Sequence, residues 1–240
     1  MIFLKKIINI TFFISLLFVS LSSQAGLISG DKWGDSALGT SGGEVTWSIM
    51  DDGISCFGTF EPTPCTTTSL SNFMPSDFIS ELERAFSLWS SIADIAFTLI
   101  TDGGENFGAP SASDIRLAGH VLDGPSDQLA HGYFPTISNT GGDIHFDITE
   151  NWSTTGDFID VFSVAVHEIG HAIGIDHSLT TDAVMYSQYN GPITDLHADD
   201  IATAQLIYGP SLTVSVPEPS SLILFMSMIG FILVKKRQLK

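Results

Sequence analysis

The stretch His-Glu-Ile-Gly-His-Ala-Ile-Gly-Ile-Asp-His constrains this chain more than any other part of it. His167 and His171 stand four residues apart, so on a helix both imidazoles project from one face and can reach one metal ion. Glu168 lies beside the first histidine, where a carboxylate can hold a metal-bound water without being a ligand. Gly174 can adopt a positive φ at little cost and turn the chain, which brings His177 back as a third nitrogen ligand. Three protein ligands with an open fourth position predict a catalytic zinc ion.

The residues before this motif support the same interpretation. Residues 158–166 are mostly apolar and predict a buried helix that leads into the motif. A chance match is the alternative for any short pattern. The motif resembles the long zinc signature of the metzincin peptidases.

Charge is distributed unevenly along the chain. Six of the nine Lys and Arg residues lie among the first six or the last six residues. Between residues 26 and 234, three basic side chains accompany all 27 acidic ones, which gives a formal charge of −24. Such a surface repels nucleic acid and anionic membranes, which argues against nucleic acid as a partner. Bound calcium would neutralise part of this charge.

Residues 1–25 have the form of a signal peptide. Two lysines precede an apolar run over residues 7–21, and Ser-Gln-Ala at 23–25 is a small-residue cleavage site. An uncleaved membrane anchor is the alternative. Export implies an oxidising compartment, so Cys56 and Cys65, which are close in sequence, are expected to form a disulfide. Two free thiols are the alternative.

The C-terminal segment, residues 211–240, has three parts. Pro-Glu-Pro at 217–219 leads into an apolar run over 222–234, and Lys-Lys-Arg follows. The run has about 13 to 15 residues, roughly 22 Å as a helix, which is short for a stable membrane span. The three parts resemble the PEP-CTERM sorting signal of Gram-negative bacteria. The resemblance implies membrane association before processing and an exosortase as a partner, with a plain tail anchor as the alternative.

The middle of the chain predicts one α+β domain over residues 44–210, after a Gly- and Ser-rich, loosely ordered segment at 26–43. Strands are expected over 44–50, 95–100 and 114–119. An amphipathic helix is expected over 75–93, with Ser76 or Asp77 as its N-cap. The residues of its expected buried face are Phe78, Leu82, Ala85, Phe86 and Trp89.

Two further segments carry a family resemblance. Residues 123–131 read Asp-Gly-Pro-Ser-Asp-Gln-Leu-Ala-His, and residues 141–147 read Gly-Gly-Asp-Ile-His-Phe-Asp. Together with the histidine motif and Val-Met-Tyr at 184–186, they resemble the matrixins, the matrix-metalloproteinase-like branch of the metzincins. The resemblance runs from about residue 43 to 209. It implies a metzincin fold: a twisted, mostly parallel five-stranded sheet with one antiparallel edge strand, an active-site helix and a C-terminal helix.

The resemblance also implies substrate-binding roles. Leu129 and Ala130 match the antiparallel edge strand that holds the substrate backbone by strand addition. Tyr186 matches the wall of the pocket for the residue after the cut bond, although Ser187 follows it where the family usually has proline. Met185 matches the methionine turn beneath the three imidazoles, and an ordinary core methionine is the alternative.

Four carboxylates match calcium ligands of the family. Asp123, Asp147 and Glu150 match one calcium site, and Asp143 matches a carboxylate near a second. Hard oxygen ligands grouped in loops suit calcium chemically. Ordinary acidic turn residues are the alternative.

His131 and His145 match two ligands of the family's second, structural zinc. The chain departs from the animal pattern here, because Arg116 and Ala118 stand where a histidine and an aspartate ligand are expected. His120 is close enough in sequence to replace the missing histidine. We therefore expect a second zinc on His120, His131 and His145, with ordinary strand and loop histidines as the alternative.

Together these features predict an exported zinc metalloendopeptidase, in the cell envelope or secreted, that acts on protein or peptide substrates. Glu168 is the expected general base for a zinc-activated water. No cysteine of the kind that blocks the zinc of animal matrixins lies between Ala25 and the first expected strand, so any latency is expected to have another source. Two alternatives are a catalytically silent binding protein of the envelope or biofilm matrix, and a tail-anchored peptidase.

Overall fold

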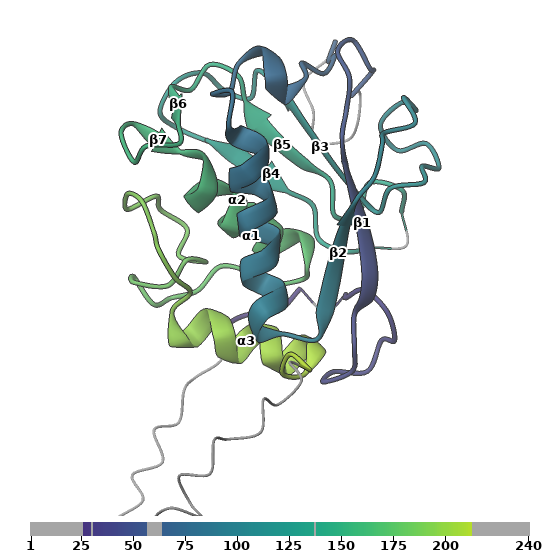
Figure 1. The fold of residues 1–240 in the computed structure, drawn as a ribbon, viewed down its shortest axis with the longest axis vertical. Coiled ribbons are helices and arrows are strands. Elements are labelled where there is room, and N and C mark those ends of the chain that lie inside the picture. The colour runs from purple at the N-terminus through teal and green to yellow at the C-terminus, as the bar shows by residue number, and fades with distance from the viewer. Residues whose placement is uncertain (1–25, 30, 57–63, 137, 213–240) are drawn as a thin grey trace, which may run out of the picture.

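The main sheet has five strands, of which one edge strand is antiparallel (Figure 1). The computed structural model describes residues 26–29, 31–56, 64–136 and 138–212. The strands are β1 (Gly43–Ile49), β2 (Ile95–Leu99), β3 (Ile115–His120), β4 (Ala130–Gly132) and β5 (Ile144–Asp147). Their order is β2-β1-β3-β5-β4, and β4 pairs antiparallel with β5 whereas the other pairings are parallel. The fold expected from the sequence is confirmed.

Three helices pack around this sheet. They are α1 (Phe78–Ile92), α2 (Val161–Ala172) and α3 (Ala198–Tyr208), and a 3-10 turn, η1 (Leu70–Asn72), precedes α1. A small second sheet joins β6 (Trp152–Ser153) and β7 (Ile159–Asp160) just before α2. Helices α1 and α2 share one hydrophobic core with the strands. Within the described part of the chain, no helix has the length and apolar character needed to cross a membrane.

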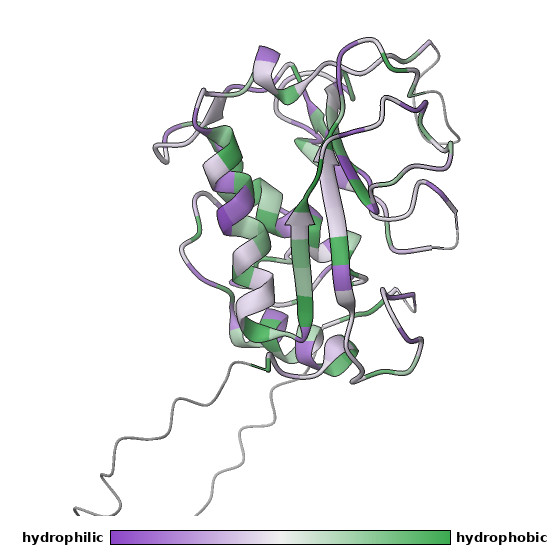
Figure 2. Cartoon of the chain, turned by 45° about the vertical axis from the view of Figure 1, so that its right-hand side comes forward, coloured by the Kyte–Doolittle hydropathy of each residue, from purple (hydrophilic) through white to green (hydrophobic). Residues whose placement is uncertain are grey.

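Helix α1 forms because its apolar residues recur at helical spacing. Hydrophobic and hydrophilic residues alternate around it in Figure 2, and the buried residues are the five expected, namely Phe78, Leu82, Ala85, Phe86 and Trp89. The indole Nε1 of Trp89 donates to the carbonyl of Val166, 2.9 Å away, which ties α1 to α2. Asp77 is the N-cap residue, but its carboxylate accepts from Thr154 Oγ1 and does not cap the helix. The buried face, more than the cap, therefore defines this helix.

The segment before β1 is held against the rest of the domain, whereas the sequence led us to expect loose order. Ser29 N donates to the Gly174 carbonyl (3.0 Å), and Asp176 N donates to the Leu27 carbonyl (2.9 Å). The indole of Trp33 donates to the carbonyl of Ala172 (2.8 Å). These long-range partners could not be read from a Gly- and Ser-rich composition. The expected signal peptide (1–25) and nearly all of the expected sorting segment (213–240) lie outside the described residues.

Candidate metal centre and active site

Helix α2 presents the zinc motif on a capped and buried scaffold. The sequence predicted a helix from residue 158, but α2 begins at Val161, because the Asp160 side chain accepts from Ser163 N (2.9 Å) and caps it. Residues 159–160 instead belong to β7. After the helix, Gly174 has a φ of +96°, and a Cβ there would meet the carbonyl of Asp31. This turn reverses the chain toward His177, as the motif predicted.

The three histidines of the motif converge. One ring nitrogen from each of His167, His171 and His177 lies within 4.8 Å of the others. The Nε2 atoms of His171 and His177 are 3.2 Å apart. Two ligands on a tetrahedral zinc lie about 3.3 Å apart when each Zn–N bond is about 2.0–2.1 Å. The spacing of this cluster therefore suits zinc.

Backbone carbonyls fix the tautomers of two of these rings. His167 Nδ1 lies 2.7 Å from the Val184 carbonyl, and His171 Nδ1 lies 2.8 Å from the Ile175 carbonyl. Because a carbonyl oxygen only accepts, each Nδ1 carries the proton and each Nε2 keeps its lone pair for a metal. Burial also lowers the pKa of His167 to about 4 and that of His171 to about 3. Both rings are therefore neutral at pH 7, which is the metal-binding form.

Glu168 is buried beside the histidines and lines the same cleft. Burial raises the pKa of its carboxyl to about 8, although the backbone N–H of Gly132 in β4 donates to it. Its Oε2 is buried and has no hydrogen-bond partner within the described residues. A buried carboxylate oxygen normally has a partner. An unpartnered one next to three convergent imidazoles fits a site built around a bound cation and water.

The cleft over these residues has a volume of about 790 Å³. Leu129, Ala130 and Tyr186 are among its lining residues. Strand β4, to which Ala130 belongs, lies at the edge of the sheet. The residues expected to bind substrate are therefore brought together around the histidine cluster.

Met185 packs beneath the motif. It is 1% exposed, and a Cβ added at Gly170 would overlap its sulfur. The glycine inside the motif is therefore needed for close packing, and not for backbone freedom. Asp200 of α3 accepts from the N–H groups of Val184 and Met185, at 2.9 and 3.1 Å. No sequence pattern predicted this tie between α3 and the methionine turn.

A second group of histidines lies on the sheet, and one of them, His131, also lines the cleft over the motif. His131 of β4 is directly opposite His145 of β5 in the antiparallel register, and His120 ends β3 on the far side of β5. One ring nitrogen from each lies within 4.8 Å of the others. His120 Nε2 is 3.2 Å from His145 Nδ1, again close to the spacing of two zinc ligands. The sequence proposed these three histidines together, and they do meet.

Arg116 has a structural role at the position where the family pattern has a metal ligand. It is 1% exposed, and its Nε and Nη2 donate to the two carboxylate oxygens of Asp102, at 2.8 and 2.7 Å. Burial alone would raise the pKa of Asp102, but donation from Arg116 and Ser48 outweighs this and holds the pKa below its usual value. A buried ion pair between Arg116 and Asp102 therefore occupies this position near the start of β3.

The carboxylates matched to two calcium sites do not form a ready cluster among the described residues. Among the described residues, no three of them bring their oxygens within 4.8 Å of one another. Asp147 accepts from the N–H groups of residues 122–124 and from Thr149, and Glu150 accepts from Ser126 N. Asp143 is 1% exposed and accepts from Arg116 N, and burial raises the pKa of its carboxyl. Asp147 and Glu150 thus shape the loop that carries Asp123.

The fold and the histidine cluster define the class of metzincin-type zinc peptidases. The family model described as Matrixin matches residues 65–209, and the chain belongs to this family. The resemblance stated from the sequence motifs is therefore confirmed at the level of the family.

Curated relatives come from animals and from a bacterium. Interstitial collagenase of Oryctolagus cuniculus is 34% identical over 157 residues, which cover 63% of this chain and 33% of the relative. Karilysin of Tannerella forsythia is 33% identical over 159 residues, covering 62% and 32%. Stromelysin-1 of Equus caballus is 36% identical over 144 residues, covering 57% and 30%. The aligned region thus spans about a third of the length of these relatives.

Proposed function

We propose that this chain is an exported zinc-dependent endopeptidase that hydrolyses peptide bonds in protein substrates. The observation that carries the proposal is the buried Oε2 of Glu168, which has no hydrogen-bond partner among the described residues and lies in a cleft shared with His167, His171 and His177. Membership of the matrixin family and relatives named collagenase and stromelysin support it.

Zinc held by the three Nε2 atoms would lower the pKa of a bound water and polarise a carbonyl. Glu168 accepts a proton from the attacking water and then donates it to the leaving amine. Its elevated pKa, with burial as the cause, suits a group that must both take and return a proton. Edge strand β4 pairs with an extended substrate and so fixes the cut bond beside Glu168. Tyr186 borders the pocket for the residue after that bond.

Further metal ions belong to the same proposal. A structural zinc on His120, His131 and His145 would join the ends of β3, β4 and β5. Calcium would bind near the loop that carries Asp123. Export through the N-terminal segment and sorting of the C-terminal segment by an exosortase complete the proposal and rest on the sequence patterns alone.

The test compares cleavage of an unfolded protein substrate by the wild type and by Glu168→Gln. Removal of a general base is expected to lower kcat by roughly 100-fold to 10⁴-fold. Zinc content by metal analysis should stay the same, because Glu168 is not a ligand. Glu81→Gln, which changes a carboxylate on α1 paired with Arg84, is the matched control and should leave kcat unchanged.

A chelator should abolish cleavage, and added zinc should restore it. Zinc-loaded Glu168→Gln that cleaves as fast as the wild type would refute the role of Glu168. A folded, zinc-loaded wild type without activity on any unfolded substrate would favour the silent binding protein instead.

A further inference from the structure

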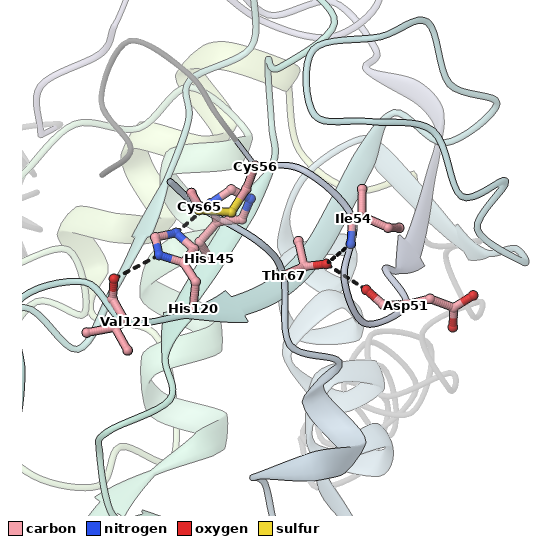
Figure 3. The surroundings of a disulfide bond; sticks show 8 residues. All are labelled: Asp51, Ile54, Cys56, Cys65, Thr67, His120, Val121 and His145. Atoms are coloured by element: carbon pink, nitrogen blue, oxygen red, sulfur yellow. Dashed lines mark hydrogen bonds between the residues drawn. A yellow bond between two sulfur atoms is a disulfide. The ribbon is translucent and has the colours of Figure 1, made fainter. Parts of the chain in front are cut away.

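A disulfide lies against one of the sheet histidines (Figure 3). Cys56 and Cys65 are joined, with their Cα atoms 5.1 Å apart, and both are buried. Their sulfur atoms and one ring nitrogen of His120 lie within 4.8 Å of one another. We propose that reduction of this disulfide creates a second kind of metal site, in which two thiolates and His120 hold a thiophilic cation such as zinc.

The backbone, and not only the disulfide, keeps the two cysteines together. Cys56 N donates to the Cys65 carbonyl (3.2 Å), and Thr67 N donates to the Ile54 carbonyl (2.8 Å). The Thr67 hydroxyl also donates to the Asp51 carbonyl (2.7 Å), as Figure 3 shows. These bonds do not depend on the sulfur–sulfur link, so the thiols stay close after reduction.

Pairing of Thr68 with β3 places the chain next to Cys65 beside His120. Thr68 and Gly119 exchange two backbone hydrogen bonds, of 2.6 and 2.9 Å, one residue before His120. His120 Nδ1 lies 3.0 Å from the Val121 carbonyl, which only accepts, so Nε2 carries the ring's lone pair. The histidine therefore has the tautomer that a metal ligand requires.

Geometry makes the disulfide and the thiolate site mutually exclusive. Two thiolates on one tetrahedral zinc lie about 3.8 Å apart, because each Zn–S bond is about 2.3 Å. Sulfur atoms in a disulfide are about 2.0 Å apart. His120 also belongs to the cluster with His131 and His145, so it is shared by both donor sets. The oxidised protein thus offers three nitrogens, whereas the reduced protein offers two softer sulfurs with His120.

The reaction balances with a dithiol as reductant. A thiolate of the dithiol attacks one cystine sulfur, the Cys56–Cys65 bond breaks, and a mixed disulfide forms. The second thiol of the reductant displaces the protein thiol, and the reductant leaves as a disulfide. Metal binding then releases two thiol protons to solvent. A cavity of about 410 Å³ lined by Cys65, His120 and Val121 gives the reductant and the ion a route to this side.

The experiment titrates oxidised protein and phosphine-reduced protein separately with Co²⁺. A phosphine is used because it competes for metal less than a dithiol does. Thiolate-to-cobalt charge transfer absorbs in the near ultraviolet, whereas cobalt on histidine nitrogens gives no such band. Cobalt at the motif of α2 therefore does not mask the result. We expect the band only in the reduced protein, with a Kd at least tenfold lower than that of the histidine cluster in the oxidised protein.

Two variants identify the ligands. The double variant Cys56→Ser, Cys65→Ser should lose the band and any response to the phosphine. His120→Gln should keep two titratable thiols but bind Co²⁺ at least tenfold more weakly. His197→Gln, a histidine outside both clusters, is the control and should match the wild type.

The potential of the disulfide gives a test without substitution. Zinc that saturates both forms should raise the midpoint potential by at least about 30 mV, since the reduced site is expected to bind at least tenfold more tightly than the histidine cluster of the oxidised protein and each tenfold difference corresponds to about 30 mV. A reduced, folded wild type with two titratable thiols, no charge-transfer band and an unchanged midpoint potential would overturn the proposal. Unaltered cobalt affinity in reduced His120→Gln would remove His120 from it.

Discussion

Gly170→Ala tests how tightly the methionine turn packs against the zinc motif. A Cβ at this position would overlap Met185 Sδ and lie 2.9 Å from Met185 Cε and 3.2 Å from Trp89 Cζ2. Met185 is 1% exposed and Trp89 is fully buried, so neither side chain has open space to move into. We predict that the substitution lowers the free energy of unfolding, although alanine usually stabilises a helix relative to glycine.

The magnitude follows from two opposed effects. Alanine in place of glycine favours the helix by about 0.5–1 kcal/mol. Overpacking a filled core costs about 1–3 kcal/mol. The net loss at Gly170 is therefore about 0–2.5 kcal/mol, and about 1 kcal/mol in the middle of that range. In a Met185→Ala background the overlap with the thioether is absent, so Gly170→Ala should instead stabilise by up to about 1 kcal/mol.

Urea unfolding of zinc-loaded protein, followed by circular dichroism, measures the free energy of unfolding of the wild type, of each single variant and of the double variant. Met50→Ala is the matched control, because Met50 is a buried methionine of a separate cluster, and its coupling to Gly170→Ala should be near zero. A Gly170→Ala variant that is more stable than the wild type, or whose effect keeps its sign without Met185, would refute the packing argument.

Further predictions concern three aspartates. Asp102→Asn should lower the free energy of unfolding by about 3 kcal/mol or more in urea titrations, because it leaves Arg116 buried without its carboxylate. Glu81→Gln, which removes the surface pair with Arg84, should change the free energy of unfolding by less than about 0.5 kcal/mol. The pKa of Asp102 is lower in the folded than in the unfolded chain. The stabilisation that its carboxylate provides is therefore present above about pH 4 and declines as the pH falls through the folded pKa. Asp102→Asn should accordingly flatten the acid limb of a plot of unfolding free energy against pH. Calcium should raise the melting temperature in scanning calorimetry, and Asp123→Asn should reduce that rise; an equal rise in both would remove Asp123 from the calcium site. Asp200→Asn should weaken zinc retention in a chelator competition, because fewer acceptor oxygens then hold the methionine turn; unchanged retention would show that α3 does not support the metal centre.

Local spacing explains why much of the site could be predicted. His167 and His171 are one helical turn apart, so their convergence depends only on the helix. Gly174 provides the turn that returns His177. Apolar periodicity likewise identified the buried face of α1. His131 and His145 were matched through family motifs, and their meeting follows from the antiparallel register of β4 and β5.

Long-range contacts explain what the sequence did not reveal. The carbonyl that orients His167 belongs to Val184, 17 positions later in the sequence, and any residue type has a carbonyl. Asp200 contacts Met185, which lies 15 positions earlier in the sequence, with no periodic pattern to indicate it. Asp102 is joined to Arg116 only once the loop after β2 folds over β3. Each of these depends on tertiary structure, on which short sequence patterns carry no information.

The contacts of the first described residues have a practical consequence for recombinant protein. Gly26 N donates to Thr203 Oγ1 of α3 (2.5 Å), and residues 27–29 pair with the chain between the second and third histidines of the motif. The buried carboxylate of Asp199 lies 3.3 Å from the position of a Cβ at Gly26, so this end of the domain is close to a buried polar group. Preparations that differ only in how their amino end is trimmed are therefore expected to differ in specific activity, and the amino end should be verified by mass before rates are compared.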